Sequence, residues 1–341
     1  MKDKTVLPLG KLPPDLLERI ISNAPISDPR VLLGPGIGLD CAVIDNGESW
    51  LVLKSDPITF ATDEIGWYAV QISANDIATT GAKPRWYLAT VLLPENKTTV
   101  KLVEDISSQL YDACRKLDIS FVGGHTEVTH GIARPIIMGT MIGEVAKDRL
   151  VTPRGSAPGD LVLLTKGVPI EATSLLAREF PGRLRGALTD AQIAEAANYL
   201  HKPGISITRD AHIAVQTGQV TAMHDPTEGG LAAALWELAR ASGHTLEVDT
   251  RRVIVPALSG RICDIFGLDP LSTIASGALL MTVKQDDAIR VASALEEDGI
   301  ACSVIGRVLE GEPQVWVDKH TTPRLLDYPT RDEITRAYEQ R

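Results

Sequence analysis

Cysteine is scarce in this sequence, and long apolar runs are missing. The four cysteines are scattered without a CxxC pair or a spacing typical of metal ligands, at Cys41, Cys114, Cys263 and Cys302. This pattern excludes a disulfide framework and indicates reduced, mostly buried thiols of a cytosolic protein. No run approaches the roughly 18 apolar residues of a membrane-spanning helix, and the opening MKDKTVLPLGKLPPDLL has no apolar signal segment. We therefore expect a cytoplasmic protein with no membrane partner.

Basic residues are in deficit as well. The chain has 34 Lys and Arg against 44 Asp and Glu, for a net charge of −10. This balance excludes nucleic acid as the main partner, although a local basic pocket for phosphate remains open. The GxxxxGK[ST] phosphate loop is absent, and GPGIG is not the dinucleotide fingerprint. A bound nucleotide therefore needs another binding scheme.

The 341 residues are enough for two domains. The first half is predicted to contain helices over 13–24, 64–80 and 98–117, and strands over 85–94, 119–122 and 134–146. Two prolines and two glycines interrupt this alternation at residues 148–160, which divides the chain into domains 1–150 and 151–341. The second half is predicted to contain helices over 170–179, 189–200, 206–218 and 286–298. The fold class is α/β or α+β.

Carboxylates meet glycines at several predicted element ends. These places are Asp40 after Gly34, Gly36 and Gly38; Asp56; Asn75 and Asp76; Gly123 to Glu127; and Asp225 with Thr227. Such clusters suit hard cations such as Mg²⁺, which prefer oxygen ligands and often bridge to phosphates. Each also has a structural interpretation: Asp40 as a turn residue, Asp56 as an Asx-turn before Pro57, and His125 or His224 as hydrogen-bonded structural histidines.

The segment MHDPTEGGLAAALWELARASG, residues 223–243, predicts a helix that ends at Gly243. Thr227 is the expected N-cap. Gly229 and Gly230 weaken the first turn by about 1 kcal/mol each relative to Ala, which indicates that something approaches this backbone closely. A helix N-terminus with free N–H groups suits a phosphate.

In order, the motifs resemble those of the aminoimidazole-ribonucleotide (AIR) synthetase superfamily. They are GIGLDCAVI, SDPITF, NDIATTGAKP, GGHTEV, LVLLTKGVPIEATSLLA, MHDPTEGGL, SGALL and VIGRV, from about residue 30 to 310. The likeness is greatest to the hydrogenase-maturation branch, the carbamoyl dehydratases. Thiamine-monophosphate kinase, selenophosphate synthetase and formylglycinamidine synthetase are further relatives.

The resemblance implies two AIR-synthetase-like domains, a homodimer whose N-terminal domains pair into a barrel, and ATP with Mg²⁺ between the domains. It implies that Mg²⁺ and phosphates are held by Asp40, Asp56 and Asp76. It implies a nucleotide site that includes Asn75, Gly123, Gly124, His125, Thr126, Thr227, Gly229 and Gly230. The catalytic residues would be Asp76, Lys166 and Asp225, with Lys166 near the phosphates or substrate. The predicted strand RWYLATVLLP has no charged residue after Arg85. We therefore expect both of its faces to be buried against other parts of the protein, which agrees with a dimer.

The sequence departs from this family pattern at several positions. Many relatives have two acids where this chain has Leu39-Asp40, and an acid where it has His125, a residue that suits Mg²⁺ poorly. Glu228 stands where the hydrogenase-maturation branch commonly has Arg. That branch carries its thiocarboxamide on a terminal Cys, whereas this sequence ends DYPTRDEITRAYEQR and its last cysteine is Cys302.

We therefore expect an ATP-dependent enzyme that transfers phosphate to activate an oxygen of a small-molecule or protein-borne substrate. Self-modifying dehydration is not expected, because it needs a thiolate on a flexible tail. One alternative is a small-molecule kinase resembling thiamine-monophosphate kinase. Another is a nucleotide-binding assembly subunit that has lost catalysis.

Overall fold

The computed structural model describes residues 7, 10–59, 61, 63–318 and 321–339. Its first half forms one sheet in the order β1-β2-β3-β6-β4-β5. The strands are β1 (Val31–Leu33), β2 (Ala42–Asp45), β3 (Trp50–Ile58), β4 (Lys83–Pro94), β5 (Ser120–Thr129) and β6 (Ile136–Val145). Neighbouring strands are antiparallel, except that β5 pairs parallel to β4 at the edge.

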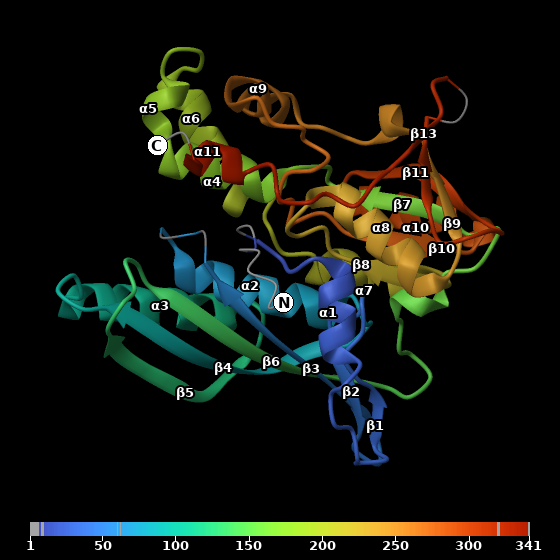
Figure 1. Cartoon of the computed structure of the whole chain (residues 1–341), viewed down its shortest axis with the longest axis horizontal. Coiled ribbons are helices and arrows are strands. Elements are labelled where there is room, and N and C mark those ends of the chain that lie inside the picture. The colour runs from blue at the N-terminus through green and yellow to red at the C-terminus, as the bar shows by residue number, and fades with distance from the viewer. Residues whose placement is uncertain (1–6, 8–9, 60, 62, 319–320, 340–341) are drawn as a thin grey trace, which may run out of the picture.

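Two helices, α2 (Ile65–Ala78) and α3 (Val100–Lys116), cover one face of this sheet, while α1 (Pro14–Ile21) runs past its β1–β2 end (Figure 1). On the covered face, Val70 and Ile77 of α2 share a core with Tyr87 of β4 and Met141 of β6. No helix of the described chain lies over the opposite face in Figure 1. That face carries Met138, which is 38% exposed, and the half-buried Leu88 and Leu92.

The helix α2 is buried on all sides, because it lies between the two halves of the chain. Thirteen of its residues are buried. Val70 and Ile77 face the first sheet, whereas Tyr68 and Ile72 belong to a core formed with the helices of the second half. A helix that is apolar all round is the type expected in a buried layer. α2 therefore fixes the first half against the second.

The second half contains a sheet in the order β13-β12-β9-β11-β7-β10-β8. Its strands are β7 (Leu161–Thr165), β8 (Val220–His224), β9 (Thr245–Val248), β10 (Leu280–Val283), β11 (Cys302–Leu309), β12 (Val315–Val317) and β13 (Arg324–Leu325). One core joins this sheet to α8 (Gly230–Ser242), and another joins it to α7 (Thr208–Thr217) and α10 (Gln285–Glu297).

A separate helical layer lies above α2 in Figure 1. It consists of α4 (Ile170–Glu179), α5 (Pro181–Leu184), α6 (Asp190–Ala197), α9 (Ala257–Phe266) and α11 (Thr335–Glu339). Short 3₁₀ turns occupy Pro153–Gly155, Asn198–Leu200 and Thr250–Arg252. The helix α11 is the last described element, and residues 340–341 lie outside the described residues. Among the described helices, none has the length and apolar character to span a bilayer.

The α/β class is confirmed, and most predicted elements lie within a few residues of the observed ones. Two expectations were wrong in detail. The strand expected over 119–122 continues to Thr129, so the glycine pair Gly123-Gly124 lies inside β5 and not in a turn. The helix that follows HDPTEGG begins at Gly230, and its N-cap is Gly229, not Thr227.

Candidate functional site

Four carboxylates from distant parts of the sequence lie close together between the two halves. Asp40 is in the loop before β2, Asp56 is on β3, Asp76 is on α2, and Asp225 directly follows β8. The first three surround one ammonium group. Nζ of Lys54 lies 3.8 Å from Oδ1 of Asp40, 3.2 Å from Oδ2 of Asp56 and 3.5 Å from Oδ1 of Asp76. Lys54 shares the same side of β3 with Asp56, because side chains two residues apart on a strand point the same way.

Burial and charge set the ionisation of this group. Burial raises the pKa of Asp76 well above its ordinary value, with Lys54 opposing the shift. Burial also opposes ionisation of Asp40, but the charges of His224 and Lys54 outweigh it and lower the pKa of Asp40. Burial tends to lower the pKa of Lys54, but Asp76 and Asp40 raise it well above normal. Lys54 is therefore a permanent cation among these acids.

A second basic side chain, that of His224, lies close to the other oxygen of Asp40. Nδ1 of His224 is 3.3 Å from Oδ2 of Asp40 and 3.9 Å from Oδ1 of Asp225. Nε2 of the same ring lies 2.8 Å from Oε2 of Glu237 on α8. The other Glu237 oxygen accepts a hydrogen bond of 3.3 Å from the hydroxyl of Tyr328 and lies 3.7 Å from Nζ of Lys11.

Several buried polar atoms of the cluster have no hydrogen-bond partner within the described chain. They are Oδ2 of Asp40, Oδ2 of Asp76, both carboxylate oxygens of Asp225, and Nδ1 of His224. Buried polar atoms without partners are costly, and their convergence indicates a ligand or ion. Lys54 faces one oxygen of Asp76, so the second oxygen of Asp76 and both oxygens of Asp225 remain for Mg²⁺, whereas Oδ2 of Asp40 lies 3.3 Å from Nδ1 of His224. The residues present therefore fit the divalent cation that the resemblance implies.

Asn75 lies beside Asp76 on α2, but its amide is used within the chain. Nδ2 donates to the carbonyl of Ile205 at 2.8 Å, and Oδ1 accepts from the N–H of Ile207 at 2.9 Å. Both partners belong to the second half. In this structure Asn75 joins the two halves and does not face an open space.

The predicted residues Gly123, Gly124, His125 and Thr126 are not brought to the acid cluster within one chain. They lie on edge strand β5, which β6 and β4 separate from β3. Three strand spacings correspond to roughly 14 Å. His125 is exposed and contacts Glu127, with Nε2 and Oε2 3.1 Å apart.

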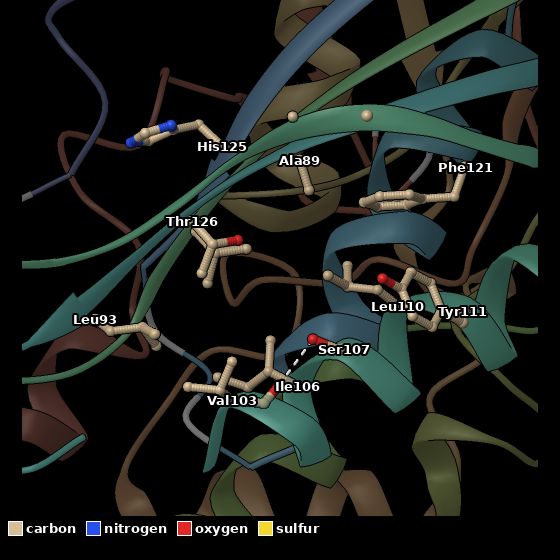
Figure 2. Close-up of a pocket in the computed structure, with 13 residues that line it drawn as sticks. Ala89, Leu93, Val103, Ile106, Ser107, Leu110, Tyr111, Phe121, His125 and Thr126 are labelled. Atoms are coloured by element: carbon tan, nitrogen blue, oxygen red, sulfur yellow. Dashed lines mark hydrogen bonds between the residues drawn. The ribbon is translucent and has the colours of Figure 1, made fainter. Parts of the chain in front are cut away.

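A pocket of about 270 Å³ lies between α3 and the β4–β5 pair (Figure 2). Its lining is mostly apolar, from Ala89, Ile106, Leu110, Tyr111 and Phe121 among others, and the described lining residues include no Asp, Glu, Lys or Arg. Figure 2 shows the ring of His125 on the opposite side of β5 from Thr126, whose side chain points toward α3. This pocket lacks the charges that phosphate chemistry needs.

Lys166 lies away from the four carboxylates and has its own partner. Its Nζ is 3.2 Å from Oδ2 of Asp210 and donates to the carbonyl of Ser206. Burial lowers the pKa of Lys166, and Asp210 opposes this shift. Because Ser206 lies between the two residues that Asn75 holds, Lys166 supports the same junction from the second half.

The glycines before α8 have left-handed backbones, with φ of 83° at Gly229 and 62° at Gly230. A Cβ atom on Gly230 would lie 2.6 Å from the carbonyl oxygen of Thr273 and 2.7 Å from that of Leu271. The close approach predicted from the sequence is therefore made by the chain's own backbone. The N–H groups of Gly229, Gly230 and Ala232 already bond to Asp332, Thr227 and Leu271, respectively.

Four members of the site were not predicted from the sequence: Lys11, Lys54, Glu237 and Tyr328. Lys54 had a local signal, because it stands two residues before Asp56. Glu237 follows His224 by thirteen residues across a loop and a helix, and Tyr328 comes from the far end of the chain. No local pattern predicts that these last two side chains meet.

Two family models match the chain. The AIR synthase related protein N-terminal domain matches residues 38–145, and the C-terminal domain of the same description matches residues 157–318. The chain is 29% identical to a hydrogenase expression/formation protein of Methanocaldococcus jannaschii, over 96% of this chain and 97% of the relative. It is 30% identical to carbamoyl dehydratase HypE of Rhodobacter capsulatus, over 88% and 86%.

Solved structures show the same fold. Hydrogenase maturation protein HypE in complex with ATP gives a TM-score of 0.68 at 24% identity, covering 92% of this chain and 90% of that one. ThiL complexed with AMPPCP and TMP gives 0.70 at 21% identity, covering 92% and 94%.

Proposed function

The chain belongs to the AIR synthase related family, and from this membership we propose that it is an ATP-dependent enzyme that transfers a phosphate to a substrate oxygen. The observation that carries the proposal is the convergence of Asp40, Asp56, Asp76 and Asp225, several of whose oxygens have no protein partner. Two relatives of the same fold, HypE and ThiL, were solved with ATP and with AMPPCP.

In this proposal the two domains, 1–150 and 151–341, hold ATP between them. Asp40, Asp56 and Asp76 hold Mg²⁺, which neutralises charge on the phosphates when bound. Lys54 contributes a fixed positive charge at the same place, and Asp225 faces it from the second half. Phosphoryl transfer is mostly positioning and charge stabilisation, so a rigid set of carboxylates and one ammonium is suited to it.

The substrate in this proposal is a separate small molecule or a protein-borne group. The four cysteines of this sequence are buried or partly buried, so none is presented for carbamoylation. The hydrogenase-maturation names of the relatives support a role in that kind of chemistry. A small-molecule kinase is the second candidate, supported by the ThiL structure.

We also propose a homodimer formed through the open face of the first sheet. Three apolar side chains, Leu88, Leu92 and Met138, lie on this face without a helix over them. Since β5 is the edge strand, a second copy would cover the sheet and bring its own Gly123 to Thr126 near the interface.

Calorimetry with ATP and Mg²⁺ tests the nucleotide proposal. Wild-type protein should bind ATP only with the cation, and Asp76→Asn should weaken binding at least tenfold while retaining the circular dichroism spectrum of the wild type. Asp105→Asn is the control, because Asp105 is an exposed carboxylate on α3 that pairs with Lys101. Wild-type protein that fails to bind ATP, or unchanged affinity in Asp76→Asn, contradicts the proposal.

Measuring ATP hydrolysis with and without candidate acceptors then separates an enzyme from a binding subunit. An acceptor-dependent increase in ADP supports phosphoryl transfer. ATP binding with no turnover for any acceptor supports the assembly subunit. Recovery of a phosphorylated small molecule as the final product supports the kinase.

A further inference from the structure

We propose that a cleft between α7 and the segment that follows α2 binds a small organic phosphate, a molecule with an apolar or aromatic body and one phosphate group. The cleft has a volume of about 700 Å³ and is formed by both halves of the chain. The first half contributes the ends of α2, α3 and β6 and the start of β4, and the second half contributes one side of α7. Pockets of this size at the junction of two domains are typical small-molecule sites.

The cleft is separate from the acid cluster, although α2 contributes to both. Among the described residues, the four carboxylates of the cluster are not part of the lining of the cleft. Asp76 faces the cluster, whereas Ala78 lines the cleft. Side chains two residues apart on an α-helix point about 200° apart, toward opposite sides of the helix. A ligand in the cleft would therefore leave the proposed ATP site free.

One wall of the cleft is built by the motif NDIATTGAKP. Its first half places Asp76 in the acid cluster, and its second half, GAKP, lines the cleft. Gly81 has a φ of 76°, and a Cβ atom there would lie 2.8 Å from the carbonyl oxygen of Arg149. The carbonyl of Thr80 accepts a hydrogen bond of 2.9 Å from the N–H of Val151. These contacts fix the backbone on both sides of Arg149, whose side chain lines the cleft.

Positive charge is in excess in the cleft, because its two acids already have basic partners. Oδ2 of Asp118 lies 3.0 Å from Nζ of Lys83, and Oε2 of Glu144 lies 3.7 Å from Nε of Arg85. The basic side chains of the lining that have no carboxylate partner in the described chain are Lys116, Arg149 and His212. Such a local excess in a chain with a net charge of −10 favours an anionic ligand.

The first turn of α7 adds to this positive potential. Thr208 and Arg209 are the first two residues of the helix, and both line the cleft. The N-cap residue, Ile207, has no side-chain oxygen to accept from the N–H groups of the first turn. A helix N-terminus without a side-chain cap carries partial positive charge and suits a phosphate. The guanidinium of Arg149 is a second group suited to phosphate, since it can donate two parallel hydrogen bonds.

The floor of the cleft is apolar, which indicates more than a phosphate ion. It includes four small side chains, none more than 6% exposed: Ala78, Ala82, Val145 and Ala211. Because three of them are alanines, a flat ring can approach this floor closely. Inorganic phosphate would leave the apolar surface uncovered, whereas a ring attached to the phosphate would remove it from water.

The test uses the full chain, without nucleotide and with a chelator that removes divalent cations. The probe is 1-naphthyl phosphate, and its binding is measured by calorimetry. The comparison ligands are 1-naphthol, which lacks the phosphate, and inorganic phosphate, which lacks the ring. One site per chain should bind 1-naphthyl phosphate at least tenfold more tightly than it binds either of these. This comparison needs no variant, so it stands even if a substitution prevents folding.

Arg149→Gln should weaken the binding of 1-naphthyl phosphate at least fivefold, because it removes the guanidinium from the lining. The matched control is Arg185→Gln, which changes an arginine that is 65% exposed outside the cleft and should leave the affinity unchanged. Arg149→Gln should bind ATP with Mg²⁺ as the wild type does, because the two sites are separate. Loss of ATP binding in this variant would show that the probe occupies the ATP site, and would overturn the proposal.

Equal affinities for the three ligands, or an unchanged affinity in Arg149→Gln, would also overturn the proposal. A hexaglutamate peptide that binds through Arg149 while 1-naphthyl phosphate does not bind would have the same effect, since the cleft would then bind an acidic protein segment. Because ATP and Mg²⁺ are absent from the probe titrations, these results leave the proposed phosphoryl transfer to be judged by its own calorimetry.

Discussion

The ammonium nitrogen of Lys54 lies 3.5 Å from a carboxylate oxygen of Asp76, a side chain that is 2% exposed at the junction of the two halves. Burial alone would keep Asp76 neutral, because an unpaired carboxylate in a poorly solvated place is costly. Lys54 opposes that effect and is held on its other side by Asp40 and Asp56. The ammonium group of Lys54 is therefore positively charged before any ion or nucleotide binds.

The first prediction concerns the glycines of α8. Gly230→Ala should lower the free energy of unfolding by about 2 kcal/mol more than Gly243→Ala, measured by chemical denaturation. Both residues have positive φ, so both substitutions carry a similar backbone cost. Only at Gly230 would the new Cβ approach backbone oxygens, those of Leu271 and Thr273; at Gly243 nothing lies within 4 Å. Equal losses in the two variants would show that the close approach does not matter.

A second prediction concerns pH. Burial raises the pKa of Glu171 to about 7, and the neighbouring Asp332 carboxylate adds to the shift. The folded state therefore keeps a proton that the unfolded state loses near its ordinary pKa of 4.5. The stabilisation is complete below that pH and is lost as pH rises toward 7, by at most about 3 kcal/mol.

Unfolding free energies of the wild type and Glu171→Gln, measured from pH 4 to 8, check this expectation. The variant should lose part of the decline that the wild type shows across this range. Burial also raises the pKa of Asp332, to about 6, so a smaller decline should remain. Glu297→Gln, an exposed helical position, should follow the wild-type curve. Parallel curves for wild type and Glu171→Gln would rule out the assignment.

The third prediction is the oligomeric state. Light scattering at micromolar concentration should give twice the chain mass for the wild type and the chain mass for Met138→Asp. A carboxylate at this place on the open face would have to be desolvated between two copies. Ile289→Asp is the matched control, because Ile289 is 78% exposed on α10 in the second half. A monomeric wild type would remove the basis for the dimer.

The fourth prediction is that none of the four cysteines acquires a carbamoyl-derived adduct. Burial raises the pKa of Cys114 to about 11 and of Cys263 and Cys302 to about 12, and it also raises the pKa of Cys41 well above its ordinary value. Thiolate is the nucleophile, and almost none is present near neutral pH. Intact-mass analysis after incubation with ATP and a carbamoyl-transferring partner should show no stable gain. A gain mapped to any of these residues, converted by ATP to a lighter adduct, would refute the claim.

The residues Asp40, Asp56, Asp76 and Asp225 were predicted to act together from the order of the motifs, and the structure brings them together. Hydrophobic periodicity alone does not predict that these residues lie close together, because it assigns each residue to a helix or strand without showing how distant elements pack.

The strand β5 is a second case in which local sequence patterns were not sufficient. Glycine pairs favour turns, yet Gly124 lies inside the strand β5. Glycine is needed at this position because a Cβ atom there would lie 1.9 Å from the carbonyl oxygen of Ala89 on β4.

The roles of Asn75 and Lys166 also depended on long-range packing. Both were expected near the nucleotide, and both are bonded to the segment 205–210 of the second half. Sequence separation between these partners exceeds anything that a local pattern describes. Lys54, in contrast, could have been predicted from the sequence, because its spacing from Asp56 places both side chains on one side of a strand.

The amide of Asn75 has a mechanical consequence. Its two hydrogen bonds to Ile205 and Ile207 tie α2 to the second half at the depth of the acid cluster, where α2 is buried on every side. Hinged separation of the halves would break both bonds and expose an apolar helix. We therefore expect the molecule to admit its ligands as a rigid body. Ligands would then reach the acid cluster past its partly exposed side chains, Asp56 and Asp40, which are 31% and 22% exposed. A hinge motion that separates the two halves would not be needed.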